Sequence, residues 1–390
     1  MVALLFEGMV LKSKVDVAEA ASRKLTVGRP NVMNRQRFLE RVEQILDSKS
    51  FTNDGPFVRE LEQSVCTLFA VKHCIAVANA TLGLEITLSA LNVTGEVIVP
   101  SFTFVATAHA IRRIGAEPVF CDISKLSYSL DVSMVEAAIT ERTTAIVAVN
   151  LYGGLADLER LADIANKYKL HLIYDSAHSL GTKWKGNWTG SLGDAEVFSL
   201  HGTKFINGFE GGLITTNNDE LAKRCALLRN FCFTGYDQVS DIGTNAKLSE
   251  IHAAMALTNF ECMDEIIAKN KTNYSWYKRY LPDQAKLLSF DEKIESNYQY
   301  VVVILPDAAS RDAIQEHLLH NDIFVRKYFY PGIHQFECYR QEGLVLPVTE
   351  DIAARVLCFP TGQEITEEDV KHICVLMTQA LESMRLIQSV

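Results

Sequence analysis

Between about residues 70 and 215, short apolar runs alternate with segments in which apolar residues recur at helical spacing. Apolar runs bounded by polar residues and glycine are typical of strands buried on both faces of a sheet. This alternation predicts a mostly parallel α/β sheet flanked by helices. The expected strands cover residues 74–77, 96–99, 118–121, 144–149, 171–174 and 196–200, and the expected helices cover 82–91, 105–114 and 158–168.

The segment before the predicted sheet is helical. Apolar residues at helical spacing predict a helix over residues 34–48. The turn-forming residues 52–56 follow, and a second helix is expected over 57–69. Residues 1–30 give no such pattern, so we predict that they form an N-terminal extension.

The pattern changes again after the predicted sheet. A long helical stretch is expected over residues 249–270, and the composition shifts near 265–295. Beyond it, a strand and two helices indicate a smaller α+β domain; they are expected over 298–305, 309–319 and 366–387. We therefore predict a large domain over residues 31–265 and a small C-terminal domain over 266–390.

Composition places the chain among ordinary globular proteins, because 48% of its 390 residues are hydrophobic and 22% are charged. The net charge is -10, and like charges form no long run. This balance argues against a nucleic-acid partner or an anionic membrane surface. A small phosphate group remains compatible with it, because a local nest of backbone N–H groups binds an anion whatever the total charge.

The nine cysteines are odd in number and never closer than seven residues. Their spacing contains no CxxC pair and no zinc cluster, so we predict no metal site and a reducing, cytoplasmic setting. The apolar start of the chain is broken by Glu7 and lacks a basic leader, so no signal peptide is expected. No uncharged apolar stretch reaches the length of about 18 residues that spans a membrane.

The segment over residues 172–216 carries the most informative chemistry. One predicted strand ends in Asp175, and Lys204 lies in the loop that follows another. Strand ends are where open α/β sheets place their ligand crevice. A simple salt bridge is the alternative interpretation. The glycines around Lys204 favour a ligand, because they let backbone approach it closely; they are Gly202, Gly208, Gly211 and Gly212.

Two further features follow predicted strands. Residues 79–81 open a helix with free N–H groups and a hydroxyl, which suit a phosphate, although a capped helix without a ligand has the same sequence. Phe104 brings an aromatic ring to the crevice unless it packs in the core. Together with Asp175 and Lys204, these are the parts that hold pyridoxal phosphate. The amine forms a Schiff base, and the carboxylate pairs with the pyridinium nitrogen.

A series of motifs also resembles a known family. In order, they are DGPFVRELE (54–62), NATLGLEITLSAL (79–91), EVIVPSFTFVATAHAI (96–111), YDSAHSLG (174–181), FSLHGTKFINGFEGG (198–212), GTNAKLSEIHAAMAL (243–257) and VLCFPTG (356–362). Over about residues 30–385 the chain resembles the DegT/DnrJ/EryC1/StrS family of sugar aminotransferases. The resemblance implies the fold-type I architecture of pyridoxal phosphate (PLP) enzymes. In it, a mostly parallel seven-stranded sheet flanked by helices forms the large domain, and a smaller α+β domain follows.

The resemblance assigns roles to individual residues. Lys204 would hold the cofactor and then move a proton between the substrate α-carbon and the cofactor C4′, while Asp175 would hold the pyridinium. His201 would touch the substrate or support Lys204. The expected cofactor contacts are Ala80, Thr81 and Ser199 on the phosphate, Phe104 stacked on the ring and His178 at the phenolic oxygen. Asn245 would reach the neighbouring subunit's cofactor in a homodimer with shared sites, unless it is only a turn residue beside Gly243.

The implied reaction moves an amino group from L-glutamate, through pyridoxamine phosphate, to a nucleotide-linked keto-sugar. The preferred acceptor is dTDP-4-keto-6-deoxyglucose, for lipopolysaccharide O-antigen, other surface polysaccharide or glycoside biosynthesis. Other acceptors are a 3-keto nucleotide sugar aminated at C3 and an oxidised octulosonate.

Three alternatives to amino transfer are a regulator from another class and two reactions of related enzymes. A regulator with the same fold would have no need of the amine, and family dehydratases carry histidine in place of Lys204. Cysteine desulfuration needs an accessible thiolate, whereas Cys225 and Cys232 fall in a predicted helix and at its end.

Overall fold

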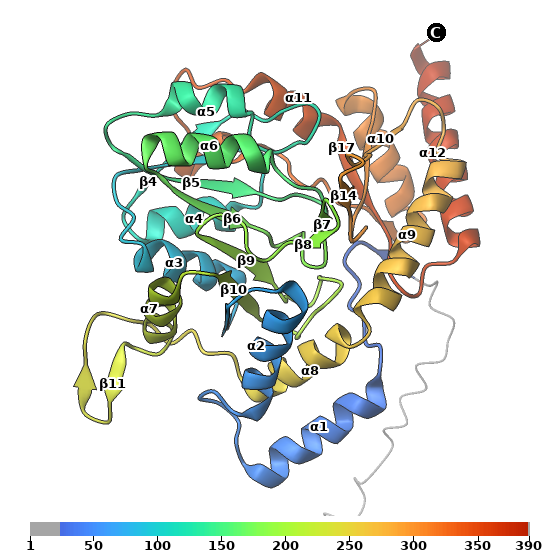
Figure 1. Ribbon diagram of the computed structural model, residues 1–390. Helices are drawn as coiled ribbons and strands as arrows, with labels where there is room; N and C mark the ends of the chain where they lie inside the picture. Colours follow the sequence, from blue (N-terminus) through green and yellow to red (C-terminus); the bar gives the residue numbers. More distant parts are fainter. Residues whose placement is uncertain (1–23, 389–390) are drawn as a thin grey trace, which may run out of the picture.

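The computed structural model describes residues 24–388 (Figure 1). Its centre is a seven-stranded sheet with the order β2-β10-β9-β6-β5-β3-β4. β10 runs antiparallel to both of its neighbours, and the other pairs are parallel, which confirms the predicted mostly parallel α/β fold. The strands are β2 (His73–Val77), β3 (Glu96–Pro100), β4 (Glu117–Cys121), β5 (Thr143–Val149), β6 (His171–Asp175), β9 (Ala195–Ser199) and β10 (Gly212–Thr216).

Helices cover both faces of this sheet, which is why its strands are apolar on both sides. One face packs against α3 (Ala80–Ala90), α4 (Val105–Arg113) and α7 (Asp219–Arg229). The other face is shared by two helix pairs, which lie over different halves of the sheet. They are α5 (Val132–Ala138) with α6 (Leu158–Tyr168), and α2 (Pro56–Phe69) with α8 (Glu250–Phe260).

The C-terminal part has a core of its own around a three-stranded sheet. The sheet consists of β13 (Lys286–Leu287), β15 (Val301–Ile304) and β17 (Val356–Phe359), and its helices are α9 (Met263–Tyr280), α10 (Ala308–Leu319), α11 (Pro347–Arg355) and α12 (Glu367–Gln388). The chain also reaches this part near its start, because β1 (Leu25–Thr26) pairs in parallel with β16 (Ile323–Phe324). Short elements fill the connections: β7 (Lys183–Trp184), β8 (Asn187–Trp188), β14 (Ile294–Glu295), η1 (Ile333–Gln335) and η2 (Glu337–Tyr339).

The helical stretch predicted over residues 249–270 is divided between two helices, α8 and α9, which meet at residues 261–262. α8 is buried on most of its circumference, whereas α9 buries a single stripe of side chains. The two helices therefore pack differently, and one continuous helix axis would not satisfy both. The break falls at Glu261 and Cys262, without glycine or proline to announce it. The pattern of hydrophobic and polar residues also did not predict β10, β17, α5 or α11.

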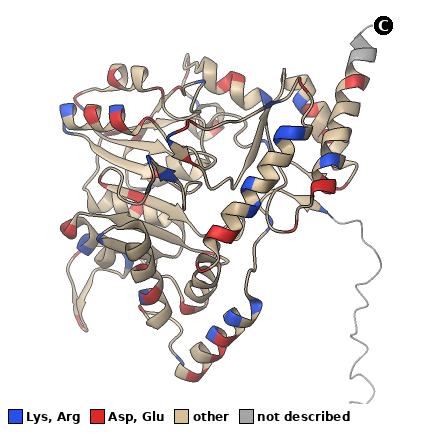
Figure 2. Cartoon of the chain, turned by 45° about the vertical axis from the view of Figure 1, so that its right-hand side comes forward, with Lys and Arg blue, Asp and Glu red and all other residues tan. Residues whose placement is uncertain are grey.

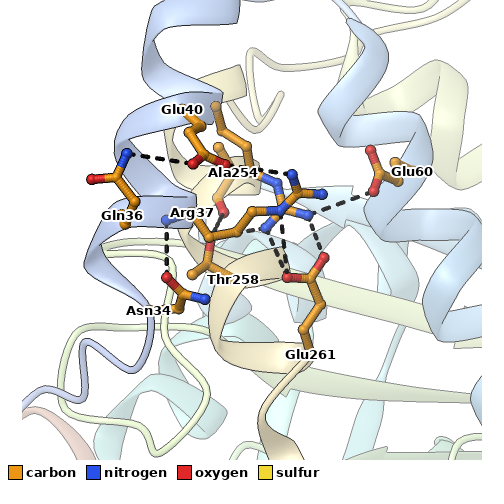
Figure 3. A network of polar contacts seen from close by, with 9 residues as sticks. Asn34, Gln36, Arg37, Glu40, Glu60, Ala254, Thr258 and Glu261 are labelled. Carbon is orange, nitrogen blue, oxygen red and sulfur yellow. Dashed lines mark hydrogen bonds and ion pairs between the residues drawn. The ribbon is translucent and has the colours of Figure 1, made fainter.

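The N-terminal helix α1 (Arg35–Ser48) is held against α2 and α8 by a buried guanidinium (Figure 3). Arg41 is only 1% exposed. Its Nη2 lies 2.5 Å from Glu261 Oε1 and 3.7 Å from Glu60, and its Nη1 donates to Thr258 Oγ1 at 2.8 Å. Because a buried charge is tolerated only with partners, these contacts fix α1 against α2 and α8.

Charged residues of both signs are interspersed over the helices (Figure 2). Within residues 24–388, no helix combines the length and the apolar character that crossing a bilayer requires. The same residues contain no cluster of three or more histidine, cysteine, aspartate or glutamate side chains arranged to hold a metal ion.

Candidate active site

Lys204 lies in the loop after β9, where the sequence places it. Its backbone N–H donates to His201 O at 2.8 Å, and its half-buried side chain donates from Nζ to Tyr300 Oη at 3.2 Å. Burial lowers the pKa of Lys204 to about 8, and the Asp175 carboxylate offsets part of this effect. An amine that loses its proton near neutral pH suits both nucleophilic attack and proton transfer.

Asp175 ends β6, at the same edge of the sheet as Lys204. Its side chain is 7% exposed and accepts hydrogen bonds from Thr107 Oγ1 at 2.7 Å and from Ala177 N at 3.2 Å. Burial raises the pKa of Asp175, although these bonds and Lys204 oppose the rise. Within residues 24–388, no cation lies at ion-pair distance from it. A protonated pyridine nitrogen would give this buried carboxylate the positive partner that it lacks.

Aromatic side chains line the small pocket beside Asp175. His178 is buried, its ring lies 4.5 Å from that of Tyr300, and burial lowers its pKa well below the usual value. Phe104 is 57% exposed, and its ring lies 6.1 Å from that of Phe329, which in turn stacks on His178 at 5.9 Å. Phe104, His178 and Phe329 all line the pocket. The sequence predicted Phe104 and His178 here, but neither Tyr300 nor Phe329.

The residues predicted to bind phosphate meet at the start of α3. Ala80 and Thr81 are its first two residues, and Asn79 caps it by accepting from Leu82 N at 2.9 Å. Ser199 pairs in register with Gly212 of β10. A Cβ atom on Gly212 would lie 2.6 Å from Ala80 N, so only glycine permits this close approach. The result is a cradle of free N–H groups and hydroxyls that fits a phosphate.

Asn245 does not join this site within one chain. Its side chain is exposed, and its backbone forms an isolated antiparallel bridge with Asn230. His201 lies in the same loop as Lys204, and its Nδ1 lies 2.8 Å from Thr203 Oγ1. The other sequence-predicted residues, Asp175, Lys204, Phe104 and His178, lie around the crevice at the carboxyl ends of the strands.

The lowered pKa of Lys204 predicts how the apoprotein captures pyridoxal phosphate at different pH values. Only the neutral amine attacks an aldehyde, so the capture rate should rise nearly tenfold from pH 6 to 7 and only about twofold from pH 8 to 9. Stopped-flow absorbance of the bound cofactor measures this rate. An ordinary lysine would keep gaining about tenfold per pH unit to about pH 10, and that profile would refute the shift.

Asp175 ends one strand of the sheet, and Lys204 and the N-terminus of α3 follow two other strands. All three strands end at the same edge. This fold and this set of residues define a PLP-dependent transferase of fold type I. Residues 33–378 match the DegT/DnrJ/EryC1/StrS aminotransferase family. The chain belongs to this family, and it is an aminotransferase.

Individual relatives cover nearly the whole chain. The dTDP-4-amino-4,6-dideoxy-D-glucose transaminase of Shigella dysenteriae is 35% identical over 358 residues, which are 90% of this chain and 97% of that protein. A pleiotropic regulatory protein of Geobacillus stearothermophilus is 32% identical over 85% of this chain and 91% of its own length. The crystal structure of DesI in the presence of its TDP-sugar product superimposes with a TM-score of 0.89 at 42% identity, covering 94% of this chain and 95% of DesI.

Proposed function

We propose that the protein uses pyridoxal phosphate to transfer an amino group from L-glutamate to C4 of dTDP-4-keto-6-deoxyglucose. The observation that carries the reaction is the half-buried amine of Lys204 at the strand edge that also carries the buried Asp175. The choice of acceptor is supported by the relative named for the 4-amino sugar and by DesI, whose product is a TDP-sugar. The amino sugar would then enter surface polysaccharide or glycoside biosynthesis.

Asp175 and Lys204 would have different roles in the proposed reaction. When bound, pyridoxal phosphate supplies an electron sink for charge that develops at the substrate α-carbon. Asp175 would hold a proton at the ring nitrogen and keep the sink effective. Lys204 Nζ would take the proton from the α-carbon of L-glutamate and deliver it at C4′. Its pKa of about 8 lets it accept and release that proton near neutral pH.

The neighbouring residues would orient these two groups. Thr107 holds one oxygen of Asp175 in place, and the Tyr300 hydroxyl holds the Lys204 amine. The rings of Phe104, His178 and Phe329 line the pocket and would keep water away from the reacting carbon. The N-terminus of α3, with Ser199, would bind the cofactor phosphate.

Turnover with defined acceptors tests the proposed reaction. The purified holoenzyme and L-glutamate would be offered dTDP-4-keto-6-deoxyglucose, a 3-keto nucleotide sugar and an oxidised octulosonate. We expect amination of the first at C4, identified by mass spectrometry and by NMR of the product. Exclusive amination of either alternative acceptor would contradict the proposed substrate but leave the aminotransferase class intact.

A regulator with this fold is the second candidate, and the Geobacillus relative gives it support. The presence of Lys204 and Asp175 argues against a regulatory role, because a sensor needs no amine that carries a proton. Cysteine desulfuration is disfavoured by the cysteines nearest to Lys204 in sequence. Cys225 is fully buried, and burial raises its pKa to about 12; burial also raises the pKa of Cys232. Neither thiol is poised to form a thiolate.

We also propose that the active unit is a homodimer with shared sites. A hairpin of β11 (Phe233–Gly235) and β12 (Gln238–Val239) projects from the body just before Asn245 (Figure 1). The hairpin and its flanks expose apolar side chains, which a second copy would cover; they are Phe231, Phe233, Tyr236, Val239 and Ile242. Asn245 would then reach the partner's cofactor phosphate.

Mixing two variants that we expect to be inactive on their own tests the shared site. If Asn245 serves the partner's site, a heterodimer of Lys204→Ala and Asn245→Ala subunits contains one site with both changes and one intact site. Random mixing should therefore restore about a quarter of wild-type activity. Activity is measured after the subunits have been exchanged under mild denaturation. Mixtures no more active than the separate variants would place Asn245 outside the partner's site.

We propose that residues 31–265 and 266–390 act as the large and small domains. α9 runs across the boundary between them, so it would connect the two rigidly. Of the expected extension over residues 1–30, the part up to residue 23 lies outside the described residues. The remainder includes β1 and contacts both domains. β1 pairs with β16, and Gly28 lies against Thr203, where an added Cβ atom would approach the Thr203 side chain to 2.9 Å.

A further inference from the structure

Residues 297–300, which lead into β15, contact both loops that carry active-site residues. β15 belongs to the three-stranded sheet of the C-terminal part, so these residues are anchored outside the seven-stranded sheet. Their side chains bind the loop after β6, which carries His178, and the loop after β9, which carries Lys204. We call residues 297–300 the clamp segment.

Asn297 binds the loop after β6. Its side chain is fully buried, and its Nδ2 donates to His178 O and to Leu180 O, both at 2.9 Å. Its Oδ1 accepts from Gln299 N at 2.9 Å, so both ends of the amide are bound. A buried polar group that is satisfied in this way makes its surroundings rigid. Asn297 therefore fixes the backbone that presents the His178 ring to the cofactor pocket.

Gln299 and Tyr300 bind the loop after β9. Gln299 is 8% exposed, and its Oε1 accepts from Phe205 N at 3.1 Å. Phe205 directly follows Lys204 and is buried, and a buried N–H group needs an acceptor. Tyr300 Oη accepts from Lys204 Nζ at 3.2 Å. Two consecutive residues of the clamp segment thus hold the amine of Lys204 and the backbone beside it.

The backbone of the clamp segment has an uncommon conformation. Tyr298 has a φ of 50°, in the left-handed region that bulky residues rarely adopt. Such strain persists where the surrounding structure imposes it, and it is concentrated at functional sites. Gly153 leaves room for the segment, because a Cβ atom there would lie 2.4 Å from Asn297 Oδ1 and 2.5 Å from Ser296 Oγ. The contacts of the segment therefore determine its shape.

We propose that the clamp segment sets the position of the two active-site loops relative to each other, with Asn297 and Gln299 as positioning residues. Neither side chain lines the cofactor pocket. Proton transfer by Lys204 requires its amine at a fixed place relative to a cofactor held by Asp175, and a misplacement of about 1 Å can cost about a hundredfold in rate. The consequence for catalysis rests on the proposed function of Lys204, whereas the contacts with the loops do not.

The first half-reaction, in which L-glutamate alone converts the holoenzyme, tests this role without a sugar acceptor. Gln299→Met removes the oxygen that accepts from Phe205 N but keeps the length of the side chain. We expect the single-turnover rate to fall by about ten- to a hundredfold, while the apparent Kd for L-glutamate changes by less than about threefold. Gln299→Glu keeps an oxygen acceptor and should recover most of the rate.

Asn297→Ala should slow the same step to a similar extent, and Asn273→Ala is its matched control. Asn273 is also fully buried, and its Nδ2 donates to Thr361 Oγ1 at 3.1 Å and to Gly362 O at 2.8 Å, within the C-terminal part. Asn273→Ala should lower the melting temperature as Asn297→Ala does, but leave the single-turnover rate within about twofold of the wild type. Cofactor content verifies that each variant is loaded.

Amide hydrogen exchange of the full-length protein, measured by mass spectrometry, locates the effect of each variant. Asn297→Ala should raise the exchange rate in residues 176–181 by about tenfold or more. Gln299→Met should do the same in residues 201–208, and Asn273→Ala should change neither loop. Unchanged exchange in both loops would overturn the positioning role.

The kinetic outcomes are equally decisive. Single-turnover rates within about twofold of the wild type for both Asn297→Ala and Gln299→Met would overturn the positioning role. Equal slowing by Asn273→Ala would also overturn it, because the loss would then follow from general destabilisation. A wild type that L-glutamate does not convert would instead refute the proposed reaction. Amide exchange alone would then decide: faster exchange confined to the two loops supports the clamp segment, and unchanged exchange overturns it.

Discussion

Replacing Lys204 with alanine should lower the rate of amino transfer by about four to six orders of magnitude. The variant loses two functions at once, because the same amine would hold the cofactor covalently and carry the proton between two carbons. Purified Lys204→Ala should therefore lack the visible absorbance band of a covalently held cofactor. Addition of L-glutamate followed by product analysis measures the remaining turnover.

Lys269→Ala is the matched control for this loss. Lys269 is another lysine whose pKa burial lowers, but its Nζ donates to Ile365 O at 2.7 Å in the C-terminal part of the chain. Removing it should leave both the absorbance band and the turnover close to those of the wild type. A small primary amine added to Lys204→Ala should restore part of the proton transfer, which a purely structural lysine would not allow. Turnover within about tenfold of the wild type would contradict the catalytic role.

Most residues of the candidate site could be placed from the sequence, because each lies next to a strand that the sequence predicts. Asp175 and Lys204 each follow an apolar strand, and strand ends in an α/β fold converge on one edge. The helix proposed to bind phosphate, α3, is predicted in the same way, because Asn79 caps it shortly after β2 ends. Local motifs and sheet topology are sufficient for these residues, since no distant contact is needed to place them.

Tyr300 and Phe329 could not be predicted, because tertiary packing alone brings them to the site. Tyr300 is 96 positions from Lys204 and comes just before β15 of a different sheet. Phe329 follows β16 and meets His178 only once the C-terminal part packs against the part that contains the seven-stranded sheet. Aromatic residues at these positions are indistinguishable in sequence from core residues.

The function of the final glutamate in the GTNAKLSE motif also could not be predicted from the sequence, because it depends on a distant contact. This glutamate has a structural function. Glu250 is fully buried and accepts hydrogen bonds from Phe57 N at 2.8 Å and Val58 N at 3.0 Å, at the start of α2. Gly55 leaves room for this carboxylate, because a Cβ atom there would lie 2.4 Å from Glu250 Cδ. The capping of one helix thus connects two motifs that lie nearly 200 residues apart, DGPFVRELE and GTNAKLSE.

Asp175→Asn should lower kcat by about a thousandfold while the protein still binds pyridoxal phosphate. The amide matches the carboxylate in shape and can still accept from Thr107, but it carries no negative charge to hold a proton on the ring nitrogen. The electron sink that the bound cofactor supplies would therefore be weaker when Lys204 takes the proton from the α-carbon. Single-turnover absorbance after addition of L-glutamate measures this step, and KM for L-glutamate should change much less than kcat.

The control for Asp175→Asn is Glu196→Gln. Glu196 is another buried carboxylate, on the neighbouring strand β9, and burial raises its pKa to about 7. Its oxygens accept from Ser176 Oγ at 2.8 Å and from Leu192 N at 2.9 Å, and it does not line the cofactor pocket. Removing its charge should leave the single-turnover rate within about tenfold of the wild type. Equal losses in the two variants would mean that the rate depends on a buried charge in this part of the sheet, and the specific role of Asp175 would be refuted.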